Sequence, residues 1–148
     1  MRRNSLTHEF VDLIPGDPED GVLYISIRYR TAVHRCACGC GEKVVTPIRP
    51  ARWHITFDGD TVSLKPSVGS WQLPCQSHYV ITNNQVRWAR RWTPEEIAAG
   101  REHDAEDVRR YYAGRVGAVA AEREPAQPGR HGWVTRAWRR LRRRPRRD

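Results

Sequence analysis

The chain has 148 residues, with 26 Lys or Arg against 17 Asp or Glu and a formal net charge of +9 at pH 7. This length suits one ordinary domain with a modest core. No apolar run approaches the roughly 20 residues of a membrane-spanning helix and the first residues lack a secretory-signal pattern, so we expect a cytoplasmic protein without a transmembrane segment.

Short β-like segments fill the chain from residue 21 to about residue 90. Apolar and polar residues alternate in GVLYISIRY, and KVVTPI, RWHITF, TVSLKP and YVITNNQVRW follow, each bounded by Gly, Pro, Asn or Asp. Asp58 with Gly59, and Asn83 with Asn84, predict tight hairpins because Gly and Asn tolerate the positive φ that such turns need. We therefore expect residues 1–92 to form a small antiparallel β domain.

Three cysteines occupy alternate positions in HRCACGCGEKVV: Cys36, Cys38 and Cys40. The segment begins and ends like a strand, so the thiols are expected at a turn, where alternate residues share one side and the intervening glycines allow tight folding. In a reducing compartment, clustered thiols bind metal or do redox chemistry more often than they form structural disulfides. Because no C-x-x-C opens a helix here, metal binding is favoured over a redox site.

The second half of a metal site is predicted at PCQSH, where Cys75 and His78 have the C-x-x-H spacing typical of a ligand pair. Zinc takes four N or S ligands in a tetrahedron. The candidate ligands are Cys36, Cys38, Cys40, Cys75 and His78, with His34 as a sixth. The favoured four are Cys38, Cys40, Cys75 and His78, with Cys36 as the replacement for one of them. A closed structural Zn²⁺ site is preferred to a catalytic site that keeps a position for water.

Ser77 lies between the two predicted ligands Cys75 and His78. Its hydroxyl is a conceivable nucleophile, but no Ser-His-acid arrangement can be read from the sequence. We expect the Ser77 hydroxyl to bond the turn or a ligand sulfur instead.

The pattern becomes helical at Thr93. In TPEE, Thr93 can cap the helix, Pro94 suits the first helical position and Glu96 can reach back, which together make a capping box. Apolar residues then recur at roughly helical spacing. We expect an amphipathic helix over residues 93–124.

The positive charge is concentrated at the C-terminal end. Residues 130–148 carry nine Arg and one Asp, a net +8, whereas residues 1–129 carry 17 Lys or Arg and 16 acids. The segment also contains Trp133, Trp138 and Leu141, so it suits a basic amphipathic helix on nucleic acid or an anionic surface. The alternative is a solvated arginine tail, and we expect residues 125–148 to be a flexible linker and tail.

Several segments together resemble a family of small bacterial proteins of unknown function. They are HEFV near the N-terminus, CACGCG, TFDG, SVGSW and PCQSHYV, and the resemblance covers residues 7 to 90. The chain departs from the family pattern at Ser70, where Asn is expected, and at Val80, where Trp is expected. The genes of such proteins lie beside those for ubiquitin-like proteins and their E1-like, E2-like and JAB-type partners. The resemblance thus implies an accessory or adaptor role in ubiquitin-like conjugation, with a protein partner from that pathway.

Three functions follow from these features. We expect first a zinc-binding accessory or adaptor protein, and a binding module rather than an enzyme. The alternative is a zinc-dependent hydrolase or transferase acting on a protein conjugate, with an open metal position lined by Asp58, His54 or His8. A nucleic-acid-binding protein acting through residues 130–148 is the weakest of the three. The predicted fold class is mainly β, a small zinc-stabilised antiparallel β domain followed by a C-terminal helix, α+β overall.

Overall fold

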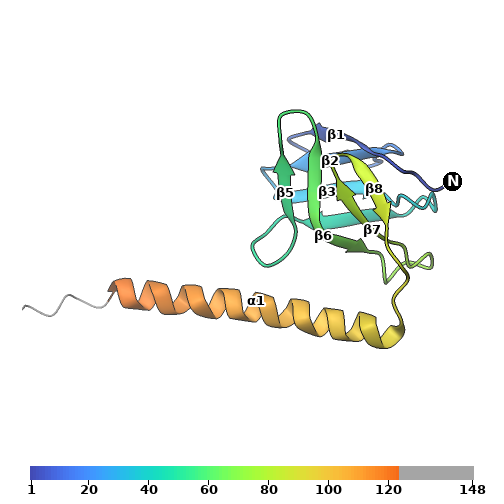
Figure 1. Ribbon diagram of the computed structural model, residues 1–148. Helices are drawn as coiled ribbons and strands as arrows, with labels where there is room; N and C mark the ends of the chain where they lie inside the picture. Colours follow the sequence, from blue (N-terminus) through green and yellow to red (C-terminus); the bar gives the residue numbers. More distant parts are fainter. Residues whose placement is uncertain (124–148) are drawn as a thin grey trace, which may run out of the picture.

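A computed structural model describes residues 1–123, with side chains to residue 116 (Figure 1). The predicted linker and basic tail, residues 125–148, lie outside the described residues. The elements are β1 (Thr7–Phe10), β2 (Val22–Ser26), β3 (Thr31–Arg35), β4 (Lys43–Pro47), β5 (His54–Phe57), β6 (Val62–Gly69), β7 (His78–Thr82), β8 (Gln85–Trp88) and α1 (Pro94–Arg123). The predicted fold class, a mainly β chain with a C-terminal helix, is confirmed.

The eight strands form two four-stranded sheets, in the orders β1-β2-β3-β4 and β5-β6-β7-β8. Neighbouring strands pair antiparallel except β1 and β2, which are parallel with Thr7 opposite Val22. A parallel pair needs a crossover longer than a hairpin, and the loop of residues 11–21 supplies it. The domain is therefore mostly, and not wholly, antiparallel.

Backbone bonds from the N-terminal segment join the two sheets. The Leu6 amide donates to the Asn84 carbonyl at 2.8 Å and the Val86 amide to the Asn4 carbonyl at 2.8 Å, which ties the chain entering β1 to the β7–β8 hairpin. At the other edge, Ile48 bridges Trp53. The two sheets thus close around one core.

The core draws on apolar side chains of both sheets. Its buried members are Leu6, Leu23, Ile25, Ala32, Cys36, Ala37, Val44, Val62, Leu64, Val68, Tyr79, Ile81 and Val86. A hydrogen bond of 2.8 Å between His34 Nε2 and the Tyr79 hydroxyl crosses this core. All the cysteines lie in two loops. One loop joins β3 to β4 and the other joins β6 to β7.

The predicted turns are confirmed. The β5–β6 hairpin has Gly59 at a φ of 102°, and the Asp58 carboxylate accepts the backbone amides of Asp60 and Thr61. The β7–β8 hairpin places Asn83 and Asn84 at φ values of 49° and 62°. Positive φ at both central residues is the mark of a type I′ turn.

Helix α1 begins at the predicted capping box, runs past the sheets and projects beyond them (Figure 1). The Thr93 amide donates to Glu96 Oε2 at 2.9 Å, and the Glu96 amide donates to Thr93 Oγ1 at 3.3 Å. Within residues 94–116, Ile97 is buried and the other side chains are half-buried or exposed. No helix in the described residues is long and apolar enough to cross a membrane.

Candidate functional site

The first cysteine loop is the β3–β4 turn, residues 36–42, as predicted. The Cys36 amide donates to the Glu42 carbonyl at 2.8 Å, and the Gly39 amide donates to the Cys36 carbonyl at 2.9 Å. Gly39 and Gly41 both have a φ of 82°, a conformation that residues with a Cβ rarely adopt. The glycines therefore allow the chain to reverse while Cys36, Cys38 and Cys40 stay on the inside of the turn.

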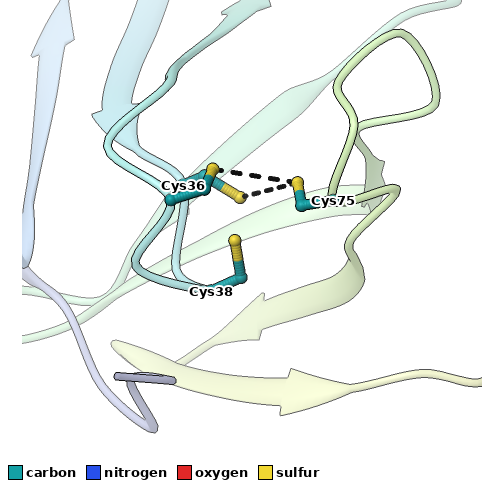
Figure 2. A group of neighbouring side chains, drawn as sticks. Cys36, Cys38 and Cys75 are labelled. Atoms are coloured by element: carbon teal, nitrogen blue, oxygen red, sulfur yellow. Dashed lines mark hydrogen bonds between the residues drawn. The ribbon is translucent and has the colours of Figure 1, made fainter.

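The second loop joins β6 to β7 and carries Cys75. The Ser70 amide donates to the Ser77 carbonyl at 2.8 Å and closes the loop, and the Gln76 amide donates to the Leu73 carbonyl at 3.0 Å. Figure 2 shows the Cys36 and Cys38 side chains directed toward the Cys75 side chain. The loop thereby delivers a fourth sulfur to the three of the first loop.

The four cysteine sulfurs form one cluster. Cys75 Sγ lies 3.9 Å from Cys36 Sγ (Figure 2) and 3.8 Å from Cys40 Sγ. The four sulfurs of Cys36, Cys38, Cys40 and Cys75 all lie within 4.8 Å of one another. Sulfurs bound to one zinc ion at about 2.3 Å in a tetrahedron would be about 3.8 Å apart. All four cysteines are free thiols, so the cluster can hold a metal ion.

The thiols influence one another's ionisation. Burial raises the pKa of Cys36. Desolvation within the cluster and the neighbouring Cys38 and Cys75 thiols raise the pKa of Cys40, which is exposed. Burial also disfavours the Cys38 thiolate, but hydrogen bonds from Ser77, Cys40 and Cys36 outweigh it and lower the pKa of Cys38 to about 6. Ser77 thus acts on the Cys36 and Cys38 thiols through hydrogen bonding.

His78 lies outside the sulfur cluster of the described residues. Its Nδ1 is 2.9 Å from the Arg90 carbonyl oxygen and its Nε2 is 3.0 Å from the Ser67 hydroxyl. The indoles of Trp71 and Trp92 flank the ring, each with its centroid 5.0 Å from that of the imidazole. The structure therefore brings four of the five predicted ligands together and places His78 in a second, adjoining arrangement.

The bonds of His78 define its neutral tautomer. A carbonyl oxygen only accepts hydrogen bonds, so Nδ1 must carry the proton that bonds Arg90. In that tautomer Nε2 is unprotonated and accepts a hydrogen bond from the Ser67 hydroxyl. A serine that donates to a histidine, which is itself oriented by a third group, is the arrangement of an activated nucleophile.

Ser67 is the site residue that the sequence reading missed. It lies where the pairing of β6 with β7 shifts register between Leu64 and Val68, which turns its hydroxyl toward His78. Pro66 comes directly before it and has no amide to donate to the sheet, and a proline inside a strand signals such an irregularity. The run KPSVG was therefore the available signal.

The other histidine and acid candidates lie outside the sulfur cluster. His34, His8 and Asp58 have partners within the fold, and His54 is exposed. His34 is fully buried, burial lowers its pKa to about 4, and its Nδ1 has no hydrogen-bond partner within the described residues. His8 Nδ1 lies 3.2 Å from Asn84 Oδ1. The bonds from Thr61 and Asp60 within the hairpin lower the pKa of Asp58 to about 2.

One family model matches this chain, over residues 10–89, slightly more than half of its length. The matched segment contains the four clustered cysteines, Ser67 and His78. No curated protein and no solved structure matches. The family match supports the predicted association with a bacterial ubiquitin-like system: the chain belongs to the family described as the bacterial ubiquitination-like system serine protease, BubE.

Proposed function

We propose that this protein is a serine protease of a bacterial ubiquitination-like system, with Ser67 as nucleophile and His78 as general base. The observation that carries the proposal is the 3.0 Å contact between the Ser67 hydroxyl and Nε2 of a histidine whose Nδ1 is bonded to the Arg90 carbonyl. The family description names the same class of enzyme. This proposal replaces our expectation of a binding module.

The surroundings of Ser67 suit attack on a protein chain. Ser67 is half-buried, whereas the preceding Lys65 and Pro66 are exposed, so the hydroxyl lies near the surface. His78 is only 7% exposed, with Trp71 and Trp92 against its ring. The base is shielded from water while the nucleophile remains within reach of a substrate.

The reaction follows from these two groups. As Ser67 Oγ bonds to the substrate carbonyl carbon, its proton passes to His78 Nε2 and the carbonyl electron pair moves to oxygen. Collapse of this intermediate breaks the bond to the leaving amine, which takes the proton from Nε2. A water molecule then attacks the acyl carbon and gives a proton to Nε2. The bond from the acyl carbon to Ser67 Oγ breaks, Oγ takes the proton from Nε2, and the carboxylic acid is released.

The metal, on this proposal, is a structural Zn²⁺ held by Cys36, Cys38, Cys40 and Cys75. Four sulfur ligands fill a tetrahedral site, which is typical of structural zinc and leaves no position for a catalytic water. The sulfur spacing of 3.8 and 3.9 Å supports this set. Of the functions considered from the sequence, we therefore propose the hydrolase, with Ser67 rather than zinc as the reacting group.

The substrate class we propose is a ubiquitin-like protein of the same system that is extended or conjugated at its C-terminus. The test is a fusion of that protein to a reporter, incubated with the wild-type chain, Ser67→Ala and Ser70→Ala. We expect cleavage at the junction by wild type and by Ser70→Ala, and none by Ser67→Ala. Ser70 is the matched control because its hydroxyl lies on the loop after β6 and has no hydrogen-bond partner in the described residues. Equal cleavage by Ser67→Ala and wild type would contradict the proposal.

A further inference from the structure

The segment that joins β8 to α1, residues 89–93, contacts His78 through three of its residues. The Ala89 amide donates to the His78 carbonyl at 2.9 Å. The Arg90 carbonyl accepts from Nδ1 at 2.9 Å. The Trp92 ring meets the imidazole edge-on, at 73° and 5.0 Å between centroids. These contacts fix the backbone, the tautomer and the ring plane of His78.

Glu96, in the first turn of α1, anchors this segment. Its carboxylate accepts hydrogen bonds from Nη2 and Nη1 of Arg90, at 2.6 and 2.8 Å, and from the Thr93 amide at 2.9 Å. The ion pair with Arg90 and the bond from Thr93 lower the pKa of Glu96 to about 2. One carboxylate therefore ties the residue that bonds His78 to the start of the helix.

Trp92 is held by packing on both sides. It stacks on Trp71 at 5.2 Å and 20°. Glycines make room for both rings: a Cβ on Gly100 would lie 2.7 Å from Trp92, and one on Gly69 would lie 2.3 Å from Trp71. The indole that borders His78 is thus seated between α1 and the end of β6.

We infer that the 89–93 segment is a positioning element for His78. Its positioning residues are Trp92, which lies within the segment, and Glu96, which anchors the segment to α1. This inference rests on the proposed function, because it assigns to α1 the task of orienting the general base. The family model ends at residue 89, so the carbonyl that orients His78 and both positioning residues come from the part of the chain beyond it. Neither residue touches the reacting atoms, and each acts through the imidazole.

Two measurements on the full chain test the inference. The first is the ¹⁵N chemical shifts of the His78 ring, which report which nitrogen carries the proton. The second is the rate at which a fluorophosphonate, a general reagent for activated serines, labels Ser67. The variants are Trp92→Ala, Glu96→Ala, and the milder Trp92→Phe and Glu96→Gln. The control is Glu106→Ala, which removes an ion pair with Arg110 on the exposed part of α1.

We expect Trp92→Ala to slow labelling about tenfold or more and Glu96→Ala about threefold to tenfold, because small misplacements of a base are costly. Both should mix the two tautomers of His78. Trp92→Phe keeps an aromatic edge and Glu96→Gln keeps a capping side chain, so both should recover much of the rate. Glu106→Ala should match wild type.

Wild-type labelling rates and an undisturbed tautomer in Trp92→Ala and Glu96→Ala would overturn the inference. The same holds for Trp92→Phe and Glu96→Gln if they are as slow as the alanine variants, since the loss would then not depend on the contacts named. Failure of wild type to label at Ser67 would instead count against the proposed function. In that case the ring shifts alone decide whether the segment sets the His78 tautomer.

Discussion

The His78 imidazole accepts the Ser67 hydroxyl at 3.0 Å across two paired strands, and Cys75, three residues before His78, belongs to the sulfur cluster. On the proposed function, the loop that carries the metal ligand Cys75 therefore leads directly to the general base His78 at the start of β7. A disturbance of the metal site should reach the base through Gln76 and Ser77. The sulfur cluster and the Ser67–His78 pair are thus separate in chemistry and joined in structure.

His78→Gln should abolish most of the protease activity. A general base typically contributes about 10²-fold to 10⁴-fold to the rate, so kcat for the fusion substrate should fall within that range while KM changes little. The control is His54→Gln, which changes an exposed histidine of β5 and should leave both constants unchanged. Steady-state kinetics on the two variants measure kcat and KM. A comparable loss of kcat in His54→Gln would contradict the role of His78 as the general base.

The cluster should bind one zinc ion per chain through four sulfurs. Cys36→Ser should lose most of the bound zinc, whereas His78→Gln should retain it, because His78 is bonded to Ser67 and Arg90 instead. Structural zinc contributes folding free energy directly, so chelation should lower the melting temperature of wild type and expose the core. Elemental analysis and thermal unfolding measure both effects. Zinc loss in His78→Gln with retention in Cys36→Ser would indicate the ligand set first expected from the sequence.

Gly69→Ala should destabilise the fold and impair the site. An added Cβ would lie 2.3 Å from Trp71 Nε1, and overpacking of this kind costs about 1–3 kcal/mol. Displacement of the Trp71 indole would also uncover the His78 ring and slow the labelling of Ser67. Gly114→Ala is the matched control: it has open space around it and should stabilise the helix by about 0.5–1 kcal/mol. Chemical unfolding gives both values, and a neutral Gly69→Ala would show that Trp71 is not held as described.

Tyr79→Phe should destabilise the domain by about 1–3 kcal/mol, because it leaves a buried polar group unpaired. The Tyr79 hydroxyl is the partner of His34 Nε2 at 2.8 Å, and both side chains are fully buried. Tyr112→Phe removes the hydroxyl of a side chain that is 51% exposed and should change the free energy of unfolding little. Equal values for the two variants would contradict a stabilising role of the His34–Tyr79 bond.

Local signals allowed much of the fold to be predicted from the sequence. The turns at Gly59 and Asn84 and the cap at Thr93 each depend on a few neighbouring residues whose backbone preferences are strong. The parallel pairing of β1 with β2 joins segments separated by an irregular loop, and no local pattern specifies it.

The candidate site also combines features that local sequence predicts with features that depend on the pairing of distant strands. The glycines at 39 and 41 marked the cysteine turn. The C-x-x-H spacing added Cys75 to it but also His78, which lies outside the sulfur cluster of the described residues. The C-x-x-H spacing could not reveal that the His78 ring faces β6, because ring direction depends on the register shift near Ser67. That register is set by pairing across the sheet, and the sequence carries only the hint of Pro66.

The most direct test of the central claim is peptide mapping of the full-length protein after treatment with a fluorophosphonate. We expect one covalent adduct per chain, located on Ser67, absent from Ser67→Ala and strongly reduced in His78→Gln. An adduct on another serine, or an unmodified Ser67 in a correctly folded, zinc-loaded chain, would contradict the assignment of Ser67 as the nucleophile.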